Sequence, residues 1–139
     1  MTLPSDPLRR FVDAQAGTFD GALAELRAGR KRGHWMWFIL PQLAGLGASE
    51  MSRRYALENL AEAGAYLAHP LLGPRLRACV RAILSHAREG AQAIFGPVDA
   101  MKLRSCLTLF DRASPTDIFA DALQTFFGGV GDPETLRRL

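Results

Sequence analysis

Alanine and leucine dominate the apolar residues of this chain, and that bias most constrains what it can fold into. The sequence holds 21 alanines and 20 leucines, against 4 valines, 4 isoleucines and 6 threonines. Alanine and leucine lose little on entering a helix, whereas β-branched side chains fit strands better. The composition therefore predicts an all-α protein and argues against a β-sandwich.

Length and hydropathy indicate how the chain is organised. With 139 residues, of which 48% are hydrophobic and 22% charged, residues 1–139 are expected to form a single globular domain around one core. The longest apolar run, 35–40, is far shorter than the roughly 20 residues that span a bilayer. No charged segment followed by an apolar stretch marks the N-terminus for secretion. We therefore expect a cytoplasmic protein with no membrane association.

Glycines, prolines and cap residues divide the chain into about seven helices with short connections, several of them short. Ser5 or Asp6 is expected to cap the first helix. Hydrophobic residues recur at three- and four-residue intervals over 72–84, the pattern of an amphipathic helix. Gly96-Pro97 is expected to begin another helix. The segment 34–42 is too short and too uniformly apolar to assign, so a buried helix and an extended segment both remain open.

Charge and cysteine usage limit the chemistry that the chain can support. The net charge is +3, and 15 of the 17 basic residues are arginines, which hydrogen-bond phosphates and carboxylates in a planar, bidentate manner. GC-rich coding produces the same bias, so the arginines alone identify no partner. Cys79 and Cys106 lack metal-ligand spacing and are expected to be buried, reduced thiols. We expect no metal site and no cofactor.

The least ordinary segment begins with the basic cluster Arg30-Lys31-Arg32 and continues through both tryptophans of the chain. Aromatic faces stack on nucleobases, and neighbouring cations bind phosphate. The pattern indicates a cleft for a phosphate-bearing or nucleotide-like molecule. Its candidate ligand contacts here are Arg32, His34, Trp35, Trp37 and Gln42. In the alternative interpretation the tryptophans fill the core and His34 bonds a backbone carbonyl.

A second candidate lies on the helix that follows Gly96-Pro97. Lys102, Arg104 and Ser105 supply cations and a hydroxyl, and Lys102 and Ser105 are three residues apart, so they share a helix face. Such a pair binds an anion or, rarely, acts as base and nucleophile. The alternative is a solvated face on which Lys102 pairs with Asp99.

A weaker candidate for phosphate contact is the segment 52–55. It follows a Gly-Leu-Gly loop and an expected cap at Ser49, and the free N–H groups of a helix start attract anions. The spacing is neither that of a Walker A loop nor that of a dinucleotide fingerprint. No nucleophile elbow or Ser-His-Asp signature is present, so catalytic residues cannot be named.

The motifs also carry a family resemblance. They are Gly29–Phe38, Pro41–Leu43, Gly45–Gly47, Tyr66–Leu76, Ile94–Gly96, Lys102–Ser105 and Leu107–Phe110. In this order they resemble the DUF1810 family of uncharacterised bacterial proteins, some of which are labelled calpastatin-like although calpain inhibitors are disordered repeats. The resemblance covers nearly the whole chain and implies a single, mainly helical domain without an established activity. The family usually has Ser-Ser where this chain has Ser105-Cys106.

Two functions from different classes follow from these patterns. The first is a small-molecule cleft for a phosphate-bearing ligand; if the chain is an enzyme, the lack of metal and nucleophile motifs favours a metal-independent hydrolase. The helix with Lys102 and Arg104 also resembles that of the YbiA-like ADP-ribose-processing glycosidases, without a motif that transfers residue by residue. The alternative is a non-catalytic module that binds protein or nucleic acid through a basic, Arg-rich surface. That surface would include Arg53, Arg54, Arg75 and Arg81.

Overall fold

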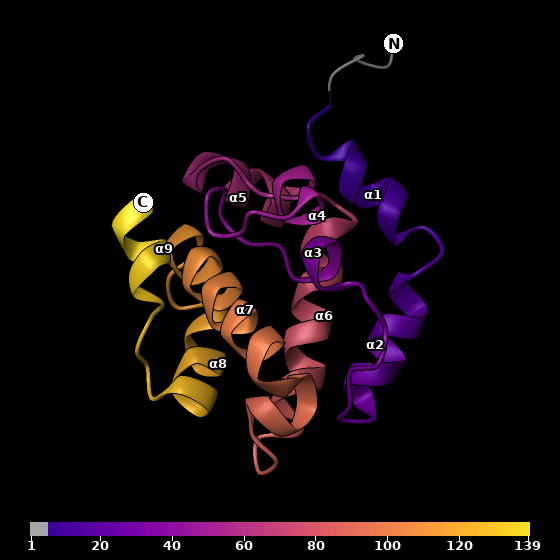
Figure 1. The fold of residues 1–139 in the computed structure, drawn as a ribbon, viewed down its shortest axis with the longest axis vertical. Helices are drawn as coiled ribbons and strands as arrows, with labels where there is room; N and C mark the ends of the chain where they lie inside the picture. Colours follow the sequence, from indigo (N-terminus) through magenta and orange to yellow (C-terminus); the bar gives the residue numbers. More distant parts are fainter. Residues whose placement is uncertain (1–5) are drawn as a thin grey trace.

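The structure, a computed structural model, describes residues 6–139, and its regular elements in that range are nine helices (Figure 1). They are α1 (Arg9–Gln15), α2 (Phe19–Arg27), α3 (Met36–Ile39), α4 (Glu50–Arg54), α5 (Leu60–Ala68), α6 (Leu72–Leu84), α7 (Ala91–Ala113), α8 (Ile118–Phe127) and α9 (Pro133–Arg138). The all-α prediction is confirmed, but the expected number of about seven helices is wrong. The unassigned segment after residue 34 contains a four-residue helix, which is too short to show an amphipathic period.

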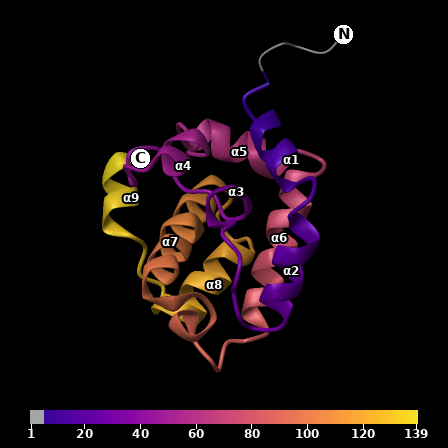
Figure 2. The same cartoon turned by 45° about the vertical axis from the view of Figure 1, so that its right-hand side comes forward.

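Helix α7 lies at the centre of the arrangement and packs against α5, α8 and α9, while α6 packs against α2, α5 and α8 (Figures 1 and 2). A row of aromatic rings crosses this core from α1 to α8. Phe11, Tyr66, Phe110 and Phe119 follow one another with ring centroids 5.2 to 5.5 Å apart, and all four are fully buried. Edge-on and tilted ring contacts of this kind add to the stabilisation from burial alone.

Two features at the chain's helix boundaries follow from local sequence. Gly96 has φ of 79° and ψ of 165°, which breaks α7 into two helical parts, and Pro97 starts the second part. Glycine tolerates this backbone conformation, and proline suits the first helical position. At the N-terminus, Ser5 lies outside the described residues, whereas the Asp6 carboxylate accepts a hydrogen bond from the backbone N–H of Leu8 at 3.0 Å.

The loop after α3 is fixed by pairing with the segment between α4 and α5. The Leu57 N–H donates to the Gln42 carbonyl at 2.9 Å, and the Ala44 N–H donates to the Leu57 carbonyl at 2.8 Å. These bonds form an isolated parallel bridge between Leu43 and Leu57. Residues 42–47 are therefore held beside residues 55–57.

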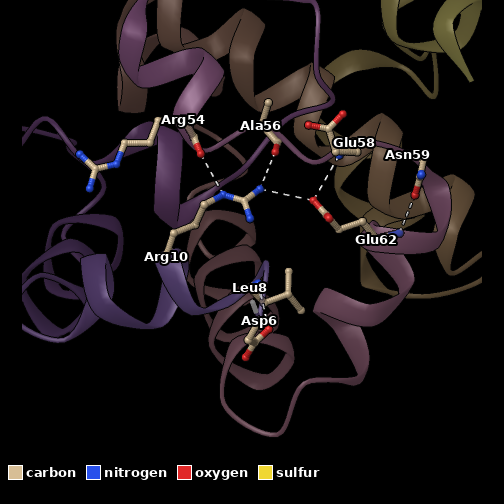
Figure 3. Close-up of polar contacts among 8 residues, drawn as sticks. All are labelled: Asp6, Leu8, Arg10, Arg54, Ala56, Glu58, Asn59 and Glu62. Carbon is tan, nitrogen blue, oxygen red and sulfur yellow. Dashed lines mark hydrogen bonds and ion pairs between the residues drawn. The ribbon is translucent and has the colours of Figure 1, made fainter. Parts of the chain in front are cut away.

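Arg10 of α1 holds the same segment from its other side (Figure 3). Its Nε donates to the Arg54 carbonyl at 2.8 Å, and one terminal nitrogen donates to the Ala56 carbonyl at 2.7 Å. The same nitrogen lies 3.3 Å from the Glu62 carboxylate. Because Arg10 bonds the carbonyls on both sides of Tyr55, it fixes the backbone that carries that ring.

Within residues 6–139, none of the helices is both long enough and apolar enough to cross a bilayer. The longest helix, α7, carries charged residues on its second half, among them Asp99, Lys102 and Arg104.

Candidate functional site

Trp35 is a core residue whose indole is held by Glu25 of α2. Only 2% of Trp35 is exposed, and its Nε1 donates to Glu25 Oε1 at 3.0 Å. The same oxygen accepts from the backbone N–H groups of Arg32 at 2.6 Å and Gly33 at 2.9 Å. Burial acts to raise the pKa of the Glu25 carboxyl, but these three donors together lower it below its ordinary value. Glu25 therefore shapes the turn that leads into the tryptophan segment.

Lys31 anchors this turn to α7. Its N–H donates to the Ile94 carbonyl at 2.8 Å, and its Nζ donates to the Gly33 carbonyl at 2.6 Å. The Nζ also lies 2.9 Å from Asp99 Oδ2, with only 7% of the Lys31 side chain exposed. The other oxygen of Asp99 lies 3.7 Å from the Nζ of Lys102. One carboxylate thus faces two lysines, of which Lys31 holds it at the shorter distance.

The Nζ of Lys102 lies 5.6 Å from the centroid of the half-buried Trp37 ring. This pair borders a small cavity of about 90 Å³, which we call the inner chamber, between the 42–47 loop, α4 and α7. Its polar lining consists of Trp37, Gln42, Ser52, Tyr55 and Lys102. A cation at this distance over an indole face is stabilised by the ring's quadrupole.

The polar groups of the inner chamber are distinctive because the protein leaves most of them without a partner. Within residues 6–139, no hydrogen bond involves the Trp37 indole N–H, the Gln42 amide or the Tyr55 hydroxyl, whereas Ser52 bonds Ser49 and the Lys102 ammonium pairs with Asp99 at 3.7 Å. No buried side-chain nitrogen or oxygen among the described residues lacks a partner, so these unpaired groups reach solvent. Only 7% of Tyr55 is exposed, so little of this residue is in contact with solvent.

A wider cavity of about 400 Å³, the outer cavity, adjoins the inner chamber and shares Gln42, Leu46 and Lys102 with it. The second half of α7 contributes Val98, Met101 and Ser105 to its wall, and the α9 segment contributes Asp132, Glu134 and Arg138. The Ser105 hydroxyl donates to the Met101 carbonyl at 3.3 Å. We refer to the inner chamber and the outer cavity together as the cleft.

A family model described as a protein of unknown function (DUF1810) matches residues 5–139. The chain belongs to the DUF1810 family. This DUF1810 chain is similar to a solved structure, the conserved hypothetical protein Rv1873 from Mycobacterium tuberculosis, with a TM-score of 0.94 and 48% sequence identity over 96% of this chain and 98% of that one. No curated protein matches it. The resemblance drawn from the motifs is confirmed.

The structure of the DUF1810 chain gathers half of the sequence candidates at the cleft. Those that line it are Trp37, Gln42, Lys102 and Ser105. Those that lie elsewhere are Arg32, His34, Trp35 and Arg104.

Three of the candidates outside the cleft, Arg104, Arg32 and His34, lie in three different environments. Arg104 donates to the carbonyls of Val130 at 2.9 Å and Gly131 at 3.1 Å, so it holds the glycine-rich loop before α9. Arg32 borders an open depression of about 610 Å³ between α2 and the start of α7. His34 is exposed to solvent.

Sequence reasoning on the DUF1810 chain missed the contributions of Val98 and Met101 to the cleft. Val98 and Met101 carried a signal, because they share one face of the helix with Lys102 at three- and four-residue spacing. Of the weaker candidate segment 52–55, Ser52 and Tyr55 line the inner chamber, and the bridge between the two loops and the bonds from Arg10 hold Tyr55 near Gln42. Within the described residues no group of three or more His, Cys, Asp or Glu is placed to hold a metal ion.

Both cysteines of the DUF1810 chain are free and fully buried. Burial raises the pKa of the Cys79 thiol to about 12 and that of Cys106 well above its ordinary value. A thiol needs its ionised form to act as a nucleophile. Neither cysteine therefore supplies chemistry to the cleft.

Proposed function

We propose that the cleft binds a small phosphate-bearing molecule, of which nucleotides are one class, with the anionic group in the inner chamber. One observation carries the proposal. The indole N–H of Trp37, the amide of Gln42 and the hydroxyl of Tyr55 have no hydrogen-bond partner among the described residues, and these three residues line the same small space as Lys102, whose ammonium has only a long contact of 3.7 Å with Asp99. Converging polar groups in a concave site are what fixes the orientation of a bound small molecule.

The charges around Lys102 favour an anion. Asp99 lies between Lys31 and Lys102, and the three side chains together carry one positive charge. Lys31 is buried and already bonded, so the accessible share of that charge lies on Lys102, whose side chain is 29% exposed. A phosphate beside the ammonium gains charge-assisted hydrogen bonds, which are stronger than neutral ones.

The proposal is for binding rather than hydrolysis, because Asp99 and Asp132 near the cleft already form ion pairs or hydrogen bonds within the protein. Asp99 is shared by the two lysines. Asp132 accepts from the backbone N–H and the hydroxyl of Thr135 at 2.9 and 2.7 Å and so caps α9. A general base needs a free lone pair within reach of the proton that it removes.

A surface of arginines for nucleic acid or protein draws less support. Arg75 donates to the Gln15 side chain at 3.3 Å and lies 4.7 Å from the ring centroid of Phe19, so it is engaged within the fold. Arg53 and Arg81 are exposed, but they lie on different helices, α4 and α6.

We also propose a cytoplasmic location. Cys79 and Cys106 are both reduced and buried. Paired cysteines are a feature of oxidising compartments, whereas free thiols persist in the reducing cytoplasm. Fractionation of the native cells would test this, and an extracellular pool would contradict it.

Thermal unfolding with a panel of orthophosphate, nucleoside monophosphates, ADP-ribose, sugar phosphates and short RNA tests the function. A ligand at 100 times its dissociation constant stabilises the folded state by about 2.7 kcal/mol, which raises the unfolding midpoint. We expect Lys102→Ala to lose this response while keeping its helical circular dichroism. Arg53→Ala, which removes an exposed cation outside the cleft, is the matched control and should respond as the wild type does.

Two results would overturn the proposal. The first is an equal response from the Lys102→Ala and wild-type proteins to every phosphate compound. The second is a response to RNA alone that falls steeply with salt and is weakened by Arg53→Ala, since that pattern belongs to a basic surface.

A further inference from the structure

The two parts of the cleft differ in size, and the difference assigns separate parts of a ligand to them. The inner chamber has about 90 Å³, and the outer cavity about 400 Å³. A protein cavity of roughly 150 Å³ holds one benzene molecule. The inner chamber therefore suits a compact group such as a phosphate, and anything as large as a ring must lie in the outer cavity.

Two apolar side chains of α7, Val98 and Met101, form what we call the apolar wall of the outer cavity, and Lys102 and Ser105 of the same helix also line that cavity. Val98 is 66% exposed and Met101 is 69% exposed, and these are the most exposed large hydrophobic residues within 6–139. They are three residues apart on one face of α7, directly beside Lys102, and Leu46 lines the same cavity from the 42–47 loop. Single exposed hydrophobic residues are common on protein surfaces. Two neighbouring ones that line the same cavity as Lys102 favour a ligand with an apolar part.

The chemistry of this wall favours an aromatic ring over a sugar. The polarisable thioether of methionine makes favourable contacts with aromatic rings, often at the ring edge. A sugar would bring hydroxyl groups against the side chains of Val98 and Met101, which offer no hydrogen bonds, and would lose part of its hydration. An aromatic ring there removes apolar surface of both partners from water.

We infer that the cleft is selective for aromatic phosphates, with the ring against Val98 and Met101 and the phosphate in the inner chamber beside Lys102. This inference rests on the proposed function and goes beyond it by naming the part of the ligand that the outer cavity recognises. A small molecule fits better here than a second copy of the chain, because the inner chamber of about 90 Å³ admits only a compact group.

Isothermal titration calorimetry with phenyl phosphate, glycerol phosphate and inorganic phosphate tests the selectivity. All three carry the anion, but only phenyl phosphate carries a ring. We expect phenyl phosphate to bind about tenfold or more tightly than glycerol phosphate, the effect of burying part of one ring. Met101→Ser should reduce that preference to about threefold or less without unfolding the protein, since Met101 is mostly exposed.

Leu60→Ser is the matched control, because Leu60 is an exposed hydrophobic residue of α5 that does not line the cleft, and it should keep the full preference. If the three phosphates bind equally and Lys102→Ala abolishes binding, the aromatic selectivity is wrong while the proposed function stands. If none of them binds, the aromatic selectivity is wrong, and the thermal-unfolding panel with nucleotides and ADP-ribose decides the proposed function. Light scattering completes the test, since a wild-type dimer that Met101→Ser dissociates would make the apolar wall a contact between copies and overturn the inference.

Discussion

Lys31 and Asp99 form an ion pair with 2.9 Å between Nζ and Oδ2, although 68 positions separate them in the sequence and only 7% of the Lys31 side chain is exposed. The pair ties the turn before the tryptophan segment to the second half of α7, beside the cleft. A buried ammonium whose carboxylate is removed remains desolvated without compensation, which destabilises proteins far more than the loss of a surface pair.

We therefore expect Asp99→Asn to lower the free energy of unfolding by about 2–4 kcal/mol. Replacing the lysine as well, in Asp99→Asn with Lys31→Met, should recover part of that loss because the buried charge is gone. Lys102→Met is the control and should change stability by about 1 kcal/mol or less, since its contact with Asp99 is longer and more exposed. Urea unfolding measures all three, and a double variant less stable than Asp99→Asn would contradict the explanation.

A second prediction concerns the stabilising role of Glu25, because a single oxygen of its carboxylate accepts three hydrogen bonds around Trp35. Glu25→Ala leaves the buried indole N–H without a partner and should destabilise the protein by about 2–4 kcal/mol. Glu50→Ala, which removes an exposed carboxylate of α4, should stay within about 0.5 kcal/mol of the wild type. Equal stabilities of these two variants in urea would show that Glu25 does not organise the turn.

Local sequence predicted much of the fold because the helix boundaries depend on nearby residues. Ser49 caps α4 with its side chain, as expected from the sequence, and Asn59 caps α5 in the same way. The break at Gly96 was also visible, since glycine followed by proline interrupts a helix. The parallel bridge between Leu43 and Leu57 was not, because pairing between two loops depends on how the helices around them pack.

The candidate site was predictable only where a helical period applied. Lys102 and Ser105 lie three residues apart, so both reach the cleft. Arg104 is two residues from Lys102, roughly 200° around the helix, and points to the glycine-rich loop instead. Trp35 precedes a helix of four residues and Trp37 lies within it, and this helix is too short for a period to show that Trp35 enters the core and Trp37 lines the cleft.

The ion pair between Asp117 and Arg77 leads us to expect that the folded protein loses stability in acid. Arg77 of α6 bonds its carboxylate at 2.9 Å, and chiefly for this reason the pKa of Asp117 falls to about 2. A lowered pKa stabilises the folded state above the ordinary value near 4, and this contribution is lost as the pH falls towards 2. Asp117→Asn should therefore destabilise the protein by about 2 kcal/mol at pH 7.

The same variant should differ much less from the wild type near pH 2, where Asp117 of the wild-type protein is itself partly protonated. Asp121→Asn is the control, because Asp121 is an exposed carboxylate of the same helix, α8. Urea unfolding at pH 7, 4 and 2.5 measures the difference. A constant gap between Asp117→Asn and the wild type across these values would contradict the role of the ion pair.

For His86 we expect the opposite dependence, in which the stability of the folded protein falls as the pH rises. Its Nε2 lies 2.7 Å from the Arg27 carbonyl, and its Nδ1 lies 3.3 Å from the Glu89 carboxylate. Both partners accept hydrogen bonds, so only the protonated imidazole can donate to both. The carbonyl first, and Glu89 next, raise the pKa of His86 above its ordinary value.

A raised pKa stabilises the folded protein fully below the unfolded value near 6.5, and the contribution is lost as the pH rises through the folded pKa. His86→Gln should therefore flatten the fall in stability of the wild-type protein between pH 6 and pH 8. His34→Gln is the matched control, since His34 is exposed, and should keep the wild-type slope. Titration of the imidazole by NMR gives the pKa directly, and a value for His86 at or below the ordinary value near 6.5 would refute the assignment.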